Sequence, residues 1–358
     1  MKSADGDAPA VSRDAFTPLL CRLTSILDET LDACPSAAQD ARSFVQSGKR
    51  LRARLMFAAA DGAPRSHDDD LVRCAAAIEL IHSASLLHDD IVDRSVERRG
   101  LKALHNIHGV RPTALTGVCL VHLALELIAP LADRVRRCLA RAGRELARGQ
   151  FTEIVRRLDV GVGPAERIII MKKKTGSIFG LSCELGGLLT GSAPIYSERL
   201  RRVGAAFGVL YQIADDVDDI FGVPDELGRE PGADLLEGVI SLPIAIALRT
   251  EHQHEVKTIL SRYARRSTAL ARCREILVRS GALQRSYDIA SIYRRTAQRH
   301  LAQLPRTTGT RWIAHVLETT VARITRHIEA SSMALVDGPA HAPTRQAPNR
   351  GLIPHCAQ

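Results

Sequence analysis

Two aspartate-rich motifs constrain this chain more than any other feature of its sequence. Each has the pattern Asp-Asp-x-x-Asp and lies inside an otherwise apolar, helix-compatible stretch, one at residues 81–100 and one at residues 211–221. Residues four apart share one face of a helix, so the first and last aspartate of each motif project in the same direction. Two such faces turned toward each other would form an anionic box. The six aspartates are Asp89, Asp90, Asp93, Asp215, Asp216 and Asp219.

Carboxylates crowded in this way predict a magnesium site that binds a diphosphate. They repel each other and raise one another's pKa unless a cation neutralises them. Hard oxygen ligands with no His/Cys cluster nearby favour Mg²⁺, which shares its coordination shell with substrate phosphates. A single acidic motif could equally be a solvated helix end or an N-terminal cap. Two copies, each in an apolar helical run, favour the metal site.

The composition indicates a globular all-α protein. The chain has 358 residues, of which 45% are hydrophobic and only 4% aromatic, and strands would need more aromatic and β-branched residues. A net charge of +9 permits an anionic partner. However, arginine is spread along the chain, and no zinc-finger spacing or RNA-binding aromatic signature is present, so we expect no nucleic-acid partner.

The cysteines and the termini predict a cytoplasmic protein without a transmembrane segment. The eight cysteines are scattered and form no Cys-x-x-Cys pair. The first residues lack the apolar core of a signal peptide, and no stretch approaches about 18 uninterrupted apolar residues. We expect a flexible N-terminus (1–12), one all-α domain (13–335) and a disordered C-terminal tail (336–358).

A basic segment precedes an apolar helix beginning near residue 51. Gly48 frees the backbone to approach a ligand, and a helix N-terminus with Lys49 and Arg52 makes an anion site. The alternative is a basic, solvated helix start. A second diphosphate would fit this segment.

Further candidate ligands flank the first motif and lie between the two motifs. His82 lies two helical turns before Asp89, although a structural role is as frequent for such a histidine. Arg98 and Arg99 follow the motif, and a guanidinium group can hold a phosphate with two hydrogen bonds, although surface charge is the alternative. Three lysines at 172–174 usually indicate a solvated turn, and of these we single out Lys174 as a ligand.

Taken together, these segments resemble the trans-isoprenyl diphosphate synthases of the polyprenyl synthetase family over about residues 40–250. The similar segments, in family order, are GKRLRA, IHSASLLHDDIVDRSVERRG, KKKTGSIFGLSCELGGLLTG, YQIADDVDDIFGVPDELGREPGADLLEG and ISLPIAIAL. The resemblance implies an antiparallel helical bundle of the isoprenoid synthase type around a central cavity, and usually a homodimer.

By matching position, the resemblance implies three sets of site residues. Isopentenyl diphosphate would be held by Lys49, Arg52, His82 and Arg99. The allylic diphosphate would be held by Arg98, Lys174, Thr175 and Gln212, and Arg229 keeps a charge that can bind phosphate. Magnesium would be carried by Asp89, Asp93 and Asp215, with Asp219. The six aspartates and Lys174 form the catalytic set.

Two positions depart from the family pattern. The family usually has a Gly-Asp pair in the apolar helix between residues 109 and 127, and this chain has Gly117-Val118 there. A carboxylate that would help to order the site is therefore missing. Val239 stands where the family has a lysine, and it cannot bind phosphate.

The predicted reaction is the condensation of isopentenyl diphosphate with geranyl, farnesyl or geranylgeranyl diphosphate. The allylic C–O bond breaks, metal and basic groups stabilise the departing diphosphate, and the double bond of isopentenyl diphosphate attacks the cation. In the family that this chain resembles, the residues four and five places before the first Asp line the floor beneath the growing chain. Here they are the small Ser85 and Ala84, and the resemblance therefore implies a medium or long product. The alternatives are a class I terpene synthase and a divergent, non-catalytic subunit of a heteromeric synthase.

Overall fold

The computed structural model describes residues 16–32, 41–61, 65–98, 100–191, 193–227, 230–262 and 268–336. The N-terminus expected to be flexible, the tail from residue 337, and the predicted ligands Arg99 and Arg229 lie outside the described residues. The boundaries of the predicted domain remain a prediction.

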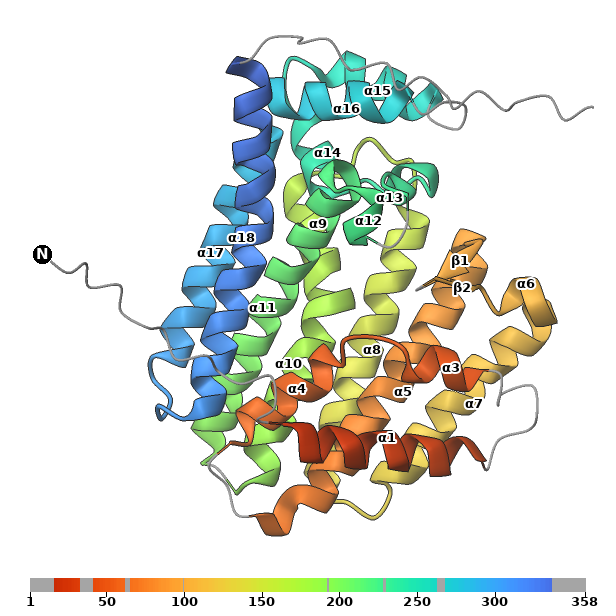
Figure 1. Cartoon of the computed structure of the whole chain (residues 1–358), viewed down its shortest axis with the longest axis vertical. Coiled ribbons are helices and arrows are strands. Elements are labelled where there is room, and N and C mark those ends of the chain that lie inside the picture. Colours follow the sequence, from red (N-terminus) through yellow and green to blue (C-terminus); the bar gives the residue numbers. More distant parts are fainter. Residues whose placement is uncertain are drawn as a thin grey trace, which may run out of the picture.

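The described residues are almost entirely helical (Figure 1). In chain order the longer helices are α1 (Thr17–Asp32), α4 (Leu51–Ala59), α5 (Asp68–Asp93), α7 (Val110–Ile128), α8 (Asp133–Val155), α9 (Pro164–Met171), α10 (Ser177–Leu189), α11 (Pro194–Phe221), α15 (Gln253–Arg262), α16 (Thr268–Arg279), α17 (Ala282–Leu301) and α18 (Thr308–Val336). The shorter ones are α3 (Ala41–Gln46), α6 (His105–His108), α12 (Pro224–Leu227), α13 (Ala233–Leu236) and α14 (Leu242–Ala247).

Three irregular pieces join these helices. A 3-10 turn (Arg65–His67) leads into α5, and a π-helical segment (Lys172–Gly176) joins α9 to α10 without a break. The two-residue strands β1 (Glu97–Arg98) and β2 (Leu101–Lys102) pair in antiparallel fashion just after the first motif. The predicted all-α bundle is confirmed.

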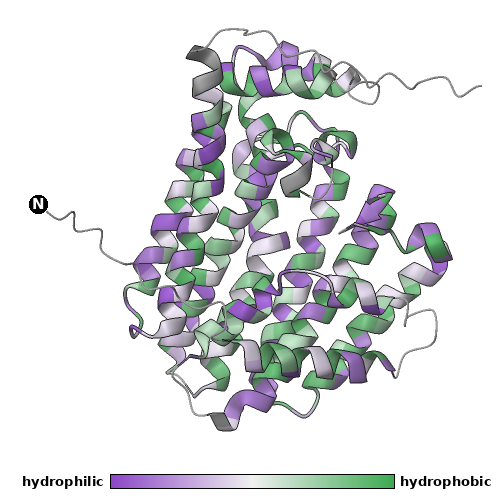
Figure 2. Ribbon diagram, in the orientation of Figure 1, coloured by the Kyte–Doolittle hydropathy of each residue, from purple (hydrophilic) through white to green (hydrophobic). Residues whose placement is uncertain are grey.

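The centre of the bundle is formed by α5, α10 and α11 (Figure 1). Helix α11 packs mainly on α10 and α17, α5 packs on α7, and α4 crosses α10. Hydrophobic residues follow the inward faces of these helices, and hydrophilic residues gather at their ends and outer faces (Figure 2). Phe179 and Phe207 are among the largest fully buried side chains.

Helices α10 and α11 are in backbone contact along a seam of glycines. A Cβ atom on Gly204 would lie 2.3 Å from the carbonyl oxygen of Phe179, and one on Gly208 would lie 2.8 Å from the Cα of Gly176. Any larger residue at these positions would force the helices apart. Gly176, the last residue of the π-helical segment, forms one side of this contact.

Local sequence features mark the starts of several helices. Helix α1 begins one residue after Phe16, and the acidic run at 68–70 forms the first turn of α5, where it complements the helix dipole. Pro194 occupies the start of α11, where its missing N–H costs nothing.

Two helices, α5 and α7, are long and apolar enough by composition to span a membrane. Within the bundle, 67% of the apolar window of α5 is buried, as expected of a core helix, but only 44% of that of α7. Helix α7 therefore presents an unusually apolar outer face.

Candidate active site

The two aspartate motifs lie at the C-terminal ends of α5 and α11, and the π-helical segment lies between them. Lys174 Nζ is 3.6 Å from Asp89 Oδ2 on α5. The next residue, Thr175, donates a hydrogen bond of 2.8 Å from Oγ1 to Gln212 Oε1 on α11. The three lysines are thus a π-helical turn inside a continuous helix, and the solvated turn that such a run usually indicates is not found.

Asp89 is buried, and the positive charge of Lys174 only partly compensates its carboxylate. Burial raises the pKa of Asp89 to about 6, against the lowering effect of Lys174, and the Asp93 and Glu153 carboxylates raise it further. A carboxylate in this condition gains from a divalent cation.

The other two aspartates of the first motif form ion pairs with arginines. Arg98 on β1 donates from Nε to Asp90 Oδ1 at 2.8 Å, and burial raises the pKa of Asp90 in spite of this pair. Asp93 is paired with Arg157, which follows α8. Arg98 was expected to hold the allylic diphosphate, and in this structure it is the partner of Asp90.

A buried network that the sequence did not reveal connects the two motifs. Arg167 on α9 is 3% exposed and forms ion pairs with Glu153 on α8 and, at 3.2 Å, with Asp216 on α11. Glu153 also pairs with Lys174. Burial alone would raise the pKa of Glu153, but Lys174 and Arg167 hold it at about 2. The only signals in the sequence are charged residues on the buried faces of α8 and α9.

Asp216 and Asp219 are committed to internal hydrogen bonds. Asp216 is fully buried and accepts hydrogen bonds from Gln212 Nε2 (3.0 Å) and from the backbone N–H of Leu242 (2.9 Å). Asp219 is also buried and accepts the backbone N–H groups of Ala233 (3.2 Å) and Asp234 (3.1 Å). Both order the segment after α11, so we do not retain Asp219 among the proposed metal ligands.

Asp215 differs from these two because it is only half-buried. Burial raises its pKa, and Arg323 of α18 opposes this rise through an ion pair of 2.6 Å. Asp215 therefore remains the member of the second motif that is available to a ligand.

The predicted isopentenyl diphosphate ligands occupy different settings. Arg52 lies over the ring of Phe179, 4.6 Å from its centroid, and burial lowers its pKa. His82 is half-buried on α5, and Lys49 is exposed just before α4. A partner that sequence reasoning missed is Glu79, which accepts the N–H of Ala53 at 3.3 Å and so fixes the start of α4.

The two departures from the family pattern lie on α7 and in the segment that follows α13. A Cβ atom on Gly117 would lie 2.3 Å from His88 Nε2, so this glycine serves the contact between α7 and α5. The next residue, Val118, is 46% exposed on the outer side of α7. The role expected of a carboxylate at this position stays a prediction. Val239 is buried.

The carboxylates present fit a divalent cation, which would take the place of the basic side chains that now lie beside them. Among the described residues, no group of three His, Cys, Asp or Glu side chains stands close enough to hold a metal ion without rearrangement. Asp89, Asp93 and Asp215 each lie beside one basic group instead. They offer hard carboxylate oxygens, which Mg²⁺ prefers.

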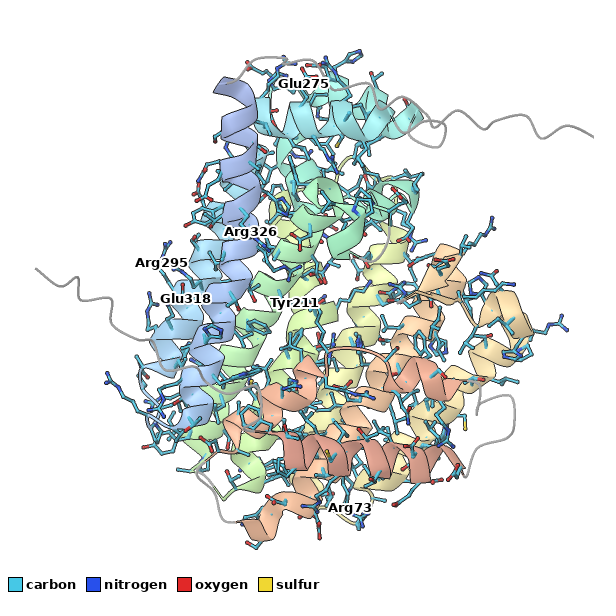
Figure 3. All side chains as sticks on the ribbon, viewed as in Figure 1. Arg73, Tyr211, Glu275, Arg295, Glu318 and Arg326 are labelled. Atoms are coloured by element: carbon cyan, nitrogen blue, oxygen red, sulfur yellow. The ribbon has the colours of Figure 1, made fainter. Side chains whose placement is uncertain are left out.

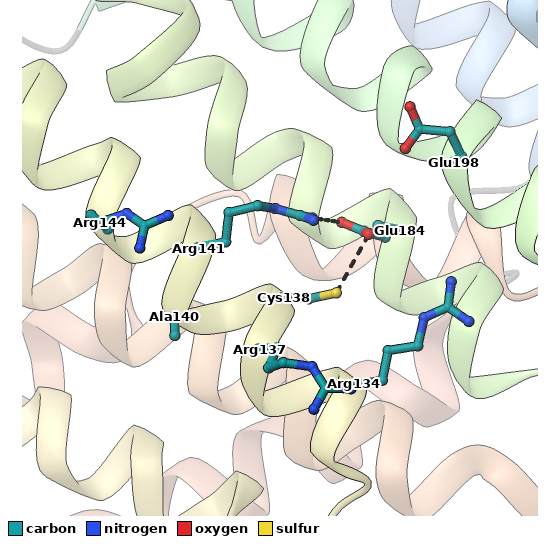
Figure 4. Close-up of a pocket in the computed structure, with 8 residues that line it drawn as sticks. All are labelled: Arg134, Arg137, Cys138, Ala140, Arg141, Arg144, Glu184 and Glu198. Atoms are coloured by element: carbon teal, nitrogen blue, oxygen red, sulfur yellow. Dashed lines mark hydrogen bonds and ion pairs between the residues drawn. The ribbon is translucent and has the colours of Figure 1, made fainter.

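A cavity of about 680 Å³ lies elsewhere, between α8, α10 and α11 (Figure 4). Its lining comes from the first half of α8, including Arg134, Arg141 and Arg144, from Glu184 in the middle of α10 and from Glu198 on α11. Because Glu153 lies near the other end of α8 and Lys174 precedes α10, this cavity is not the aspartate site.

Known proteins give the same fold and family. Residues 36–279 match the model of the polyprenyl synthetase family. Nonaprenyl diphosphate synthase from Mycobacterium tuberculosis is 31% identical over 301 residues, which are 83% of this chain and 90% of that protein. Heptaprenyl diphosphate synthase component 2 from Geobacillus stearothermophilus is 32% identical over 264 residues, which are 72% of this chain and 80% of that protein.

Two solved structures of prenyl synthases have the same fold. The crystal structure of polyprenyl synthase from Caulobacter crescentus, complexed with calcium and isoprenyl diphosphate, is 30% identical with a TM-score of 0.79, and covers 89% of this chain and 99% of that chain. A decaprenyl diphosphate synthase from Rhodobacter capsulatus is 25% identical with a TM-score of 0.78, and covers 87% of this chain and 98% of that chain. The predicted family, fold and enzyme class are confirmed: the chain belongs to the polyprenyl synthetase family and is a prenyl diphosphate synthase.

Proposed function

We propose that this chain condenses isopentenyl diphosphate with an allylic diphosphate in a magnesium-dependent reaction and releases a longer trans-polyprenyl diphosphate. The observation that carries the proposal is the π-helical segment, whose Lys174 reaches Asp89 of one motif while its Thr175 reaches Gln212 beside the other. The Caulobacter relative, whose structure holds calcium and isoprenyl diphosphate, supports the same ligands here.

The basic residues divide between two diphosphates. Lys174, Thr175 and Gln212 hold the allylic diphosphate between the motifs, where the ammonium group of Lys174 stabilises charge that develops on the leaving group. Magnesium at Asp89, Asp93 and Asp215 supplies further positive charge to the same oxygens when it is bound. The departing diphosphate takes the proton that is lost when the new double bond forms.

The second diphosphate belongs to isopentenyl diphosphate. Lys49 and Arg52 precede and begin α4, and His82 lies on α5, two turns from Asp89. A class I terpene synthase has no need of this second set, so these residues favour elongation. A heteromeric subunit remains the other candidate because two relatives are named component 2 of heptaprenyl diphosphate synthase.

Incubation of the purified protein with radiolabelled isopentenyl diphosphate, Mg²⁺ and each of the three primers tests the function. We expect labelled products of extended chain length, and none after addition of EDTA. Labelled hydrocarbon instead of diphosphate ester would indicate a terpene synthase. Incorporation that appears only when a second protein is added would indicate a heteromeric subunit.

Product length is expected to depend on the residues beneath the first motif. Ala84 is buried and Ser85 half-buried, and the Ser85 hydroxyl donates to the carbonyl oxygen of His82 at 2.7 Å. Ser85→Phe places a ring in the path proposed for the growing chain and should shift the products to shorter lengths, as measured by chromatography. Ser85→Ala, which keeps the volume small, should leave the lengths unchanged. If Ser85→Phe and the wild type gave products of equal length, the growing chain would not pass Ser85.

We further propose a homodimer formed through the outer face of α7. Leu115, Val118 and Leu125 share this face and are 69%, 46% and 47% exposed, respectively. A second copy would cover this apolar stripe. Sedimentation of the wild type should give twice the chain mass, and Leu115→Asp should give a monomer, whereas Ile195→Asp on the distant start of α11 should not. A monomeric wild type would favour a different subunit as the partner.

A further inference from the structure

Asp215 of the second motif and the nearby Asp218 receive their counter-charge from the C-terminal part of the chain. Helix α18 packs along α11 and carries Arg323, whose Nη2 is 2.6 Å from Asp215 Oδ1 and whose Nε donates to Asp218 Oδ2 at 2.9 Å. One turn further on, His327 Nε2 lies 2.8 Å from the other oxygen of Asp218. One guanidinium group therefore bridges two carboxylates, and the sequence showed no motif for it.

Arg323 also shares an aromatic cluster with a proposed substrate ligand. Its guanidinium group lies 5.3 Å from the ring centroid of Tyr211, which Figure 3 labels on α11. The Tyr211 ring is 5.5 Å from that of Phe179, which carries Arg52 on its face. Arg52 and Arg323 thus flank the same pair of rings, so Arg323 belongs to the polar site and not to the outer surface of α18.

Arg323 stays charged in this position. Burial alone would lower its pKa, but Asp215 and Asp218 raise it above the usual value. An arginine held by two carboxylates competes directly with any cation that approaches Asp215.

We propose that Arg323 is a positioning residue that occupies Asp215 in the substrate-free protein and yields it only when a metal ion arrives together with a diphosphate. The inference rests on the proposed role of Asp215 as a metal ligand. A metal ion alone must displace the guanidinium group without compensation. With diphosphate present, the displaced guanidinium group has an anion to bind, so the exchange is favourable.

The consequence is an order of binding that can be measured without turnover. Replacing Arg323 by methionine removes the competitor and leaves Asp215 more negative, so a metal ion alone should bind more tightly. The same change removes a partner of the diphosphate, so the gain in metal affinity that diphosphate produces should shrink. A residue that merely held α18 in place would not produce these opposite changes.

The test uses Mn²⁺, which accepts the same oxygen ligands and is followed by the loss of its free electron paramagnetic resonance signal. Asp89→Asn and Asp93→Asn together, in all proteins, remove both proposed ligands of the first motif and restrict the comparison to the second motif. In this background, Arg323→Met should bind Mn²⁺ alone about three- to fivefold more tightly. Added inorganic diphosphate should tighten Mn²⁺ binding less in Arg323→Met than in the protein that keeps Arg323.

Two further variants complete the design. Arg326→Met is the matched control, because Arg326 lies on the same helix, is exposed (Figure 3) and has no hydrogen bond or ion pair within the described ranges. Arg326→Met should bind Mn²⁺, with and without diphosphate, as tightly as the protein that keeps both Arg323 and Arg326. Arg323→Lys keeps the charge but cannot bridge two carboxylates. Its Mn²⁺ affinity should therefore lie between that of Arg323→Met and that of the protein that keeps Arg323. It also replaces Arg323→Met if that variant does not fold.

The outcomes separate the inference from the function on which it rests. Equal Mn²⁺ affinity with and without Arg323 would contradict the proposed competition between Arg323 and the metal ion for Asp215. Failure of Mn²⁺ and diphosphate to bind the protein with intact Asp89 and Arg323 would instead remove the proposed metal site itself.

Discussion

Asp89→Asn should lower kcat/KM for isopentenyl diphosphate incorporation about 10²- to 10³-fold, with the fold intact. The substitution keeps the size of the side chain but removes the negative charge that a cation needs. Because burial already disfavours the charged form of Asp89 and raises its pKa to about 6, the neutral amide should be tolerated in the metal-free protein. Steady-state kinetics at saturating Mg²⁺ and circular dichroism measure the two effects.

Asp70→Asn is the matched control for this prediction. It lies in the first turn of the same helix, about 28 Å along α5 from Asp89. It should leave the rate unchanged. A similar loss in both variants would mean that α5 as a whole has been damaged, and an unaffected Asp89→Asn would remove this carboxylate from the proposed metal site.

Arg167→Leu should lower the free energy of unfolding by about 3 to 5 kcal/mol at pH 7. The change leaves Glu153 and Asp216 buried near each other without the guanidinium group that lies between them. Unfolding by urea, followed by circular dichroism, measures the loss. Arg272→Leu, which breaks ion pairs of an exposed arginine with Glu255 and Glu275, should cost within about 1 kcal/mol.

The pH dependence provides an internal check of the same prediction. In the wild type the pKa of Glu153 is lowered to about 2, so its ion pairs contribute stability above the ordinary glutamate pKa near 4.5. That contribution is lost as pH falls from about 4.5 toward 2. The difference between wild type and Arg167→Leu should therefore shrink over this range. A difference that is constant with pH would point to lost packing instead of lost charge pairing.

The sequence predicted the helices and both motifs because each is a local pattern. Helical spacing of apolar residues located α5 and α11, and the repeat of Asp-Asp-x-x-Asp located the six aspartates within them. The resemblance then supplied the family and enzyme class, both of which the comparisons support.

The partners of the aspartates could not be predicted in this way. Glu153, Arg157, Arg167 and Arg323 are single charged residues on separate helices or loops, and only the packing of the bundle brings them to the motifs. Their charge gives no signal in a chain with 49 lysines and arginines and 40 aspartates and glutamates. The distinction between Asp215, which is half-buried, and Asp219, which binds backbone N–H groups, likewise depends on the segment that follows α11.

The position of Arg323 late in the chain determines when Asp215 gains its counter-charge during protein synthesis. Asp215 and Arg323 are 108 residues apart. At a translation rate of about 5–20 residues per second, Arg323 is added about 5 to 20 s after Asp215. During that interval Arg167 and Glu153 are already present, so one half of the polar network can form early. Asp215 and Asp218, by contrast, have no counter-charge from Arg323 until α18 is synthesised.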